Sequence, residues 1–141
     1  MTSTDSAKKH GRLAGKTAVI LGASDERSMG FATARRFVEE GANVVIAARR
    51  KEATQALADR IGAKAVACDI TKEEDLAALA QAALDHFGRL DAAINYAGIE
   101  APAAILDVTA EDLRRSSDVH FVGATLFIKQ MARAMAEGGS I

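Results

Sequence analysis

The segment Val19–Ala32, VILGASDERSMGFA, decides the fold because its pattern changes at Gly22. The apolar run before this glycine predicts a buried strand. After Gly30, apolar residues recur at helical spacing, which predicts a helix that ends near Gly41. A strand that turns directly into a helix gathers free backbone N–H groups and the positive end of the helix dipole at one point, which suits a phosphate or pyrophosphate. A Cβ at Gly22 is expected to enter that phosphate space.

The rest of the chain alternates between short apolar runs and amphipathic stretches. The expected strands are residues 43–47, 63–68 and 90–95, and the expected helices are residues 51–60, 71–87 and 109–137. Thr71-Lys72-Glu73-Glu74 has the pattern of a capping box, and Thr109 marks another helix start. Strands that alternate with helices predict an α/β fold, a Rossmann-type doubly wound parallel sheet with its ligand crevice at the carboxyl ends of the strands.

Length, charge and cysteine content narrow the class of protein. The 141 residues suffice for one domain, with residues 1–14 expected to form a flexible tail and residues 15–141 a dinucleotide-binding domain. A net charge of −1 favours neither nucleic acid nor an anionic membrane as a partner. The single cysteine, Cys68, is expected to be a buried, inert thiol, and its isolation indicates a reducing cytoplasmic location. No metal site is predicted.

Several motifs occur together in a recognisable order. They are the Gly-rich turn after the first strand, Cys68-Asp69-Ile70 after the third, and Asn95-Tyr96-Ala97-Gly98 at the end of the fourth. With the strand–helix order, they make Lys16–Ile141 resemble the N-terminal half of a short-chain dehydrogenase/reductase. The cofactor-binding residues that this resemblance implies are Gly22, Ser24, Arg27, Ser28, Met29, Gly30, Arg49, Arg50, Asp69, Ile70, Asn95, Ala97 and Gly98.

The resemblance also implies a role for each part of this set. The turn 22–30 would cradle the pyrophosphate, and Asp69 would accept a hydrogen bond from the adenine amino group, with Ile70 beside the ring. Residues 95–98 would fix the central strand and line the ribose. Two alternatives remain open from the residues alone, namely that Asp69 caps the following helix and that residues 95–98 form an ordinary turn.

The cofactor expected from the sequence is NADP, with NAD as the alternative. NAD-selective Rossmann folds place an acidic residue after the second strand to bind the ribose 2′-hydroxyl. Here Arg49 and Arg50 occupy that place, and a guanidinium suits the 2′-phosphate of NADP. The resemblance puts Arg27 where many NADP-preferring members carry a basic residue. The alternative is that these arginines are solvated ends of secondary-structure elements.

The chain departs from the family pattern in two places. The turn reads G-x5-S-x-G, which is similar to the turn of the enoyl reductase branch. His120 occupies the position at which the family usually has a relay asparagine, which makes it a candidate catalytic residue, although a packed histidine fits the sequence equally well.

The expected function is hydride transfer between NADP(H) and a carbonyl or alcohol substrate. The family's catalytic Ser and Tyr-x-x-x-Lys are expected beyond residue 141, since the only tyrosine is Tyr96. Residues 1–141 alone are therefore expected to show no turnover and to associate. Reduction of an enoyl C=C bond and a non-catalytic nucleotide-binding or assembly module are the alternatives.

The later part of the last expected helix, residues 116–137, is apolar nearly all round. A helix of this kind is expected to be buried on every side, with one face on the sheet and the other on a second subunit of a dimer or tetramer. Packing within one larger domain is the alternative.

Overall fold

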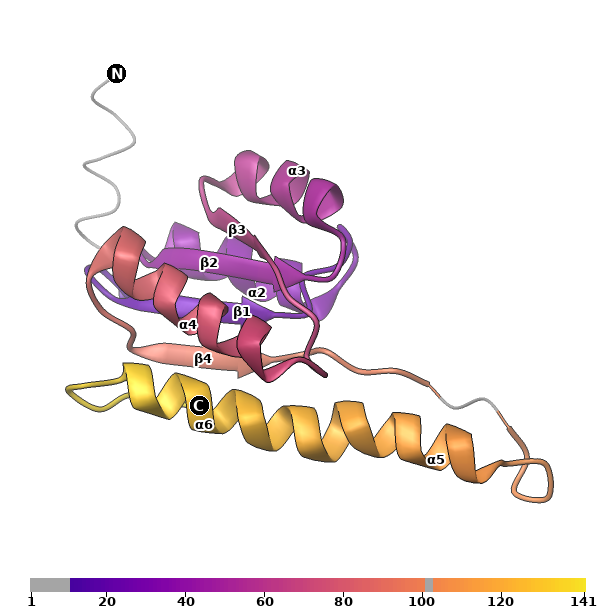
Figure 1. Cartoon of the computed structure of the whole chain (residues 1–141). Coiled ribbons are helices and arrows are strands. Elements are labelled where there is room, and N and C mark those ends of the chain that lie inside the picture. The colour runs from indigo at the N-terminus through magenta and orange to yellow at the C-terminus, as the bar shows by residue number, and fades with distance from the viewer. Residues whose placement is uncertain (1–10, 101–102) are drawn as a thin grey trace.

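The computed structural model describes residues 11–100 and 103–141. Strands and helices alternate, and the last helices follow one another directly (Figure 1). The elements are β1 (Thr17–Leu21), α2 (Met29–Glu39), β2 (Asn43–Ala48), α3 (Lys51–Ile61), β3 (Lys64–Ala67), α4 (Glu73–Phe87), β4 (Ala92–Asn95), α5 (Ala110–Ser117), the π-helix η1 (Asp118–Gly123) and α6 (Ala124–Ala134). The strands form one parallel sheet in the order β3-β2-β1-β4, which confirms the predicted α/β fold.

Helices cover both faces of the sheet because successive side chains of a strand point to opposite sides. Val19 and Leu21 pack in a core cluster with residues of α4 and α6, whereas Ile20 packs in a second cluster with residues of α2 and α3. All five residues of β1 are buried. The buried strand β1 therefore fixes the position of the turn that follows it at the carboxyl edge of the sheet.

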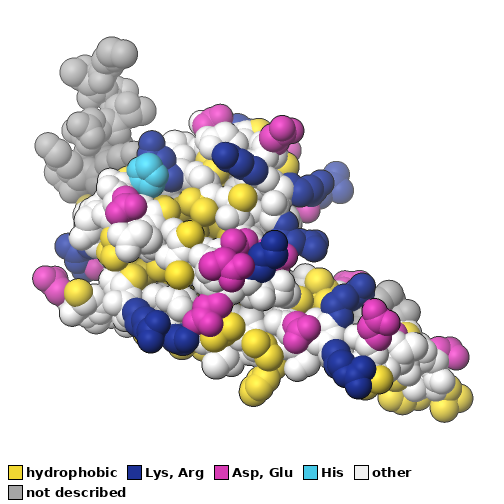
Figure 2. All heavy atoms as spheres, in the orientation of Figure 1, with side chains coloured by type: hydrophobic (Ala, Val, Ile, Leu, Met, Phe, Trp, Pro, Cys, Tyr) yellow, Lys and Arg dark blue, Asp and Glu magenta, His cyan; other side chains and the backbone are white. Residues whose placement is uncertain are grey.

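Helices α5, η1 and α6 form one continuous rod, residues 110–134, whose α5 end projects past the carboxyl end of β4 (Figure 1). The rod ends at Ala134, earlier than the predicted end at residue 137. Phe127 and Met131 are buried, but Phe121 is 71% exposed and Ile128 is 52% exposed. One side of the rod is thus buried against the sheet, whereas the side expected to meet a second subunit is exposed among the described residues, and hydrophobic groups show on the surface of the rod (Figure 2).

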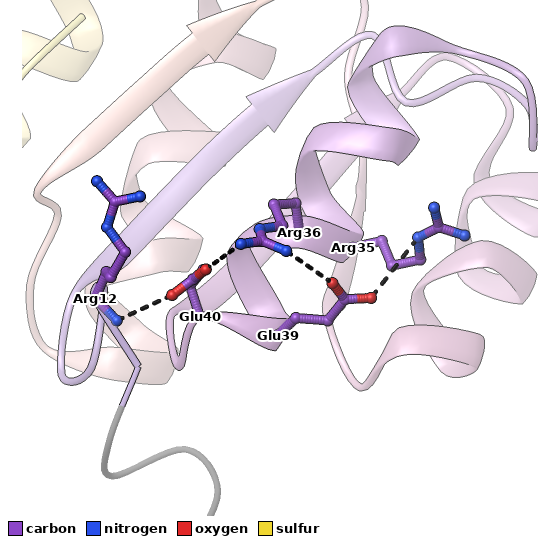
Figure 3. Close-up of polar contacts among 5 residues, drawn as sticks. All are labelled: Arg12, Arg35, Arg36, Glu39 and Glu40. Atoms are coloured by element: carbon purple, nitrogen blue, oxygen red, sulfur yellow. Dashed lines mark hydrogen bonds and ion pairs between the residues drawn. The ribbon is translucent and has the colours of Figure 1, made fainter.

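The chain begins its contacts with the domain before β1. The backbone N–H of Leu13 donates to the carbonyl of Glu40 at 2.8 Å, and that of Arg12 donates to the Glu40 carboxylate at 3.1 Å. Arg36 holds the same carboxylate from within α2 (Figure 3). The Arg12 N–H lowers the pKa of Glu40 below its ordinary value. Residues 11–14, assigned to the tail from the sequence, thus lie on the domain, and residues 1–10 fall outside the described part.

The two predicted helix starts have different outcomes. Thr109 caps α5 in a complete capping box with Asp112, as predicted. The capping box predicted at Thr71 is wrong, because both the N–H and the hydroxyl of Thr71 donate to the Asp69 carboxylate, at 2.9 and 2.7 Å. Helix α4 begins at Glu73 without a side-chain cap. Thr71 cannot cap the helix because it completes the turn after β3.

The last residues of the chain lie beside β4. Ser140 forms a parallel bridge with Ala92, and the N–H of Ala93 donates to the Ser140 carbonyl at 2.9 Å. This pairing places Ser140 beside β4 at the edge of the sheet. Among residues 11–100 and 103–141, no helix combines the length and apolar character that a membrane crossing requires.

Candidate functional site

A cleft of 540 Å³ opens at the carboxyl ends of the strands, the place where doubly wound sheets bind ligands. The segment after each of the four strands contributes to its wall, and the rod adds one side. The lining residues are Leu21, Gly22, Ser24, Ala48, Arg49, Cys68, Asp69, Ile70, Thr71, Tyr96, Ala97, Gly98, Ile99, Arg115 and Val119.

A glycine is needed at position 22 because of the neighbouring protein backbone, and not because of the phosphate space as predicted. Its φ is +97°, and a Cβ there would lie 2.6 Å from the carbonyl carbon of Tyr96 and 2.7 Å from the nitrogen of Ala97. The expectation that this Cβ would enter the phosphate space is therefore wrong, since it would strike the backbone that follows β4. Gly30 allows a second close approach, because its Cβ would lie 2.7 Å from the carbonyl oxygen of Gly22.

Residues 23–29, which separate these two glycines, form a turn that is held by its own hydrogen bonds. Ser28 is the N-cap of α2: its hydroxyl accepts a hydrogen bond from the N–H of Phe31 at 3.1 Å and donates to the carbonyl of Asp25 at 2.7 Å. The Asp25 carboxylate accepts the N–H of Arg27 at 2.7 Å. The first N–H groups of a helix have no intrahelical partner, so α2 presents donors at this turn.

Arg49 is the predicted basic residue that lines the cleft, as an exposed side chain directly after β2. Arg50 instead lies with its guanidinium 3.5 Å from the carbonyl of Ser24, and Arg27 is exposed on the turn outside the lining. Met29 and Gly30 shape the start of α2 without lining the cleft. The structure therefore brings Gly22, Ser24, Arg49, Asp69, Ile70, Ala97 and Gly98 together and leaves Arg27, Ser28, Met29, Gly30, Arg50 and Asn95 outside the lining.

The end of β3 holds an acidic group ready to accept hydrogen bonds. The hydrogen bonds from Thr71 lower the pKa of Asp69, and the positive charges of Lys72 and Arg49 act in the same direction. Asp69 is therefore ionised at neutral pH. The neighbouring Cys68 is buried, and burial raises the pKa of its thiol to about 12, which confirms that it is a poor nucleophile.

His120 and Asn95 act on the segment that follows β4. The Nε2 atom of His120 lies 2.8 Å from the carbonyl oxygen of Ile99 and 3.2 Å from its nitrogen, and the Asn95 side chain accepts the N–H of Ala97 at 2.9 Å. Neither lines the cleft, but both hold residues 97–99, which do. Asn95 itself borders a smaller hollow between β4 and α6.

Sequence reasoning missed the cleft residues Tyr96, Arg115 and Val119. The hydroxyl of Tyr96 lies 3.0 Å from that of Thr33 on α2, which ties the end of β4 to that helix. Arg115 and Val119 are spaced four residues apart and so share a helix face, but only the position of the rod directs that face at the cleft. Among the described residues, no group of three or more His, Cys, Asp or Glu is placed to hold a metal ion.

A family model described as enoyl-(acyl carrier protein) reductase matches residues 22–141. The chain belongs to the short-chain dehydrogenase/reductase family. It is 38% identical to tropinone reductase-like 1 of Erythroxylum coca, over 95% of this chain and 51% of that protein. The chain spans about half the length of the curated relatives that it matches.

Solved structures of the family show the same arrangement. A short-chain dehydrogenase from Mycobacterium smegmatis superposes with a TM-score of 0.86 at 29% identity, over 92% of this chain and 57% of that one. The fold also matches actinorhodin polyketide ketoreductase, solved with NADPH, with a TM-score of 0.79 at 23% identity, over 88% of this chain and 49% of that one. The chain is therefore part of an oxidoreductase family that normally uses NAD(P).

We predict that Gly22→Ala destabilises the domain and does not merely weaken ligand binding. The matched control is Gly15→Ala, because Gly15 also has a positive φ, +76°, but its Cβ would meet nothing within 4 Å. Both variants strain the backbone, and only Gly22→Ala adds a backbone clash, so its free energy of unfolding should fall by about 1–3 kcal/mol more. Urea unfolding measures both. An equal loss of unfolding free energy in both variants would show that the contact between residue 22 and residues 96–97 tolerates a Cβ.

Proposed function

We propose that the full-length protein is an NADP-dependent oxidoreductase that transfers a hydride between NADP(H) and a carbonyl or alcohol substrate. The observation that carries this proposal is a single cleft that joins the Gly22 turn, the Arg49 guanidinium and the Asp69 carboxylate. These groups match three parts of the cofactor: the pyrophosphate, the 2′-phosphate and the adenine amino group.

The residues present fit a dinucleotide. The close approach of Gly30 to Gly22 keeps the α2 N-terminus against the end of β1, and a helix N-terminus beside this turn suits a phosphate. Arg49 supplies a positive charge without a carboxylate within 4 Å among the described residues. When bound, the nicotinamide supplies the hydride chemistry. The chain described here binds and orients the cofactor, and His120 holds the segment after β4 in place.

The preference for NADP(H) over NAD(H) provides the test. We predict that Arg49→Ala weakens NADP binding by about 1.5–3 kcal/mol, the value of a charge-assisted hydrogen bond, and leaves NAD binding nearly unchanged. Calorimetric titration of the full-length protein with both cofactors measures this. Arg35→Ala is the control, since Arg35 lies on α2 and pairs with Glu39 at 3.9 Å. Equal affinity of the wild type for both cofactors would contradict the proposal.

Reduction of an enoyl C=C bond is the second candidate for the same site. It is supported by the G-x5-S-x-G turn, with Ser28 as the N-cap of α2, and by the description of the matching family model. NADPH oxidation with matched ketone and enoyl substrates separates the two reactions. Cofactor binding without turnover of either substrate by the full-length protein would favour a nucleotide-binding module.

We also propose that the protein forms a dimer or tetramer through the outer face of the rod, defined by Phe121, Val122 and Ile128. These side chains are 71, 44 and 52% exposed. Ile128 also borders the hollow between β4 and α6. Large apolar side chains exposed on one helix are a feature of interaction sites.

Charge on this face should prevent association. We predict that Phe121→Glu with Ile128→Glu lowers the oligomeric state of the full-length protein, because two like charges would have to be buried without a partner. Light scattering gives the mass, with Lys51→Glu on α3 as the control. An unchanged mass in the double variant would exclude this face as the interface.

A further inference from the structure

The inner face of the rod forms one wall of the cleft. Gly123 fits closely against the end of β3, since a Cβ there would lie 2.8 Å from the carbonyl oxygen of Ile70. Val119 is 6% exposed and lines the cleft, and Arg115 lies one helical turn further along the same face. The contact at Gly123 thus directs Arg115 at the cleft.

The segments that line the cleft fall into two groups, according to the helix that follows each segment in the chain. Gly22 leads to α2 and Arg49 leads to α3, and these helices pack together on one face of the sheet. Ile70 leads to α4, which packs with α6 on the other face. Arg115 therefore lies on the α4 side, with Ile70 and Val119, and across the cleft from the helix N-terminus that suits a phosphate.

No ion pair among the described residues explains the position of Arg115. Its side chain is exposed, and among the described residues no carboxylate lies within 4 Å of its guanidinium. The hydrogen bonds from Thr109 lower the pKa of Asp112, and the positive charge of Arg115 acts in the same direction. Arg114, next to it on α5, does not line the cleft. A free guanidinium at the rim of a ligand cleft is available to a ligand.

We propose that Arg115 covers the adenine base of the bound cofactor by stacking its planar guanidinium on the ring. This inference rests on the proposed function and adds a binding residue to that site. Ile70 and Val119 provide apolar walls suited to a flat ring, and Asp69 provides an acceptor for the exocyclic amino group. A guanidinium stacks on an aromatic face, whereas an ammonium group lacks the matching planar shape. Arg49, on the α3 side, remains the partner of the 2′-phosphate.

The test compares Arg115→Ala, Arg115→Lys and the neighbouring control Arg114→Ala in the full-length protein. The ligands are NADP⁺, NAD⁺, adenosine 5′-monophosphate and adenosine 2′,5′-bisphosphate, titrated by calorimetry. Arg115→Ala should weaken all four by a similar factor of about two to five. Arg115→Lys should recover only part of that loss, and Arg114→Ala should bind as the wild type does. Both positions are exposed on the helix surface, so circular dichroism should show unchanged folding.

Three results would overturn the inference. They are unchanged binding in Arg115→Ala, a loss confined to the 2′-phosphorylated ligands, and full recovery by Arg115→Lys, which would mean that charge alone acts. If the wild type binds these ligands and Arg115→Ala binds them equally well, the inference fails and the proposed function stands. If the wild type binds none of them, both fail.

Discussion

The backbone at the end of β1 is in contact with the segment after β4, and no side chain fits between them. Gly22 lies against residues 96–97, and its N–H donates to the carbonyl of Ala47 at 2.8 Å. The N–H of Tyr96 donates to the carbonyl of Leu21 at 2.8 Å. The central strand is thereby held by both neighbours at the point where the turn begins. Because the interior side is filled, the turn must run outward over the edge of the sheet before α2 begins.

A second glycine contact places the rod. Gly123 lies against Ile70 and is the last residue of the π-helix η1. π-Helical turns are frequent at functional sites, where they alter which residues share a face. Here Val119 is buried beside the cleft and His120 reaches the backbone of Ile99. The same rod therefore supports the cleft on its inner face and leaves Phe121 exposed on its outer one.

Much of this fold could be predicted from the sequence because its signals are local. Buried strands appear as continuous apolar runs, and Gly62 and Gly88 end their helices in left-handed conformations, as glycine commonly does. The capping box at Thr71 could not be judged in this way, since Asp69 competes for the same hydroxyl. Arg115 could not be found because its role depends on the direction of the rod, which a contact with Ile70 determines.

We propose that one cofactor spans the carboxyl ends of all four strands. Hydrogen exchange of the full-length protein with and without NADPH tests it most directly. We predict slower exchange together at residues 22–24, 69–71 and 96–99, segments that are distant in sequence and that contribute to this cleft. Protection that omits these segments, or that is confined to the outer face of the rod, would contradict it.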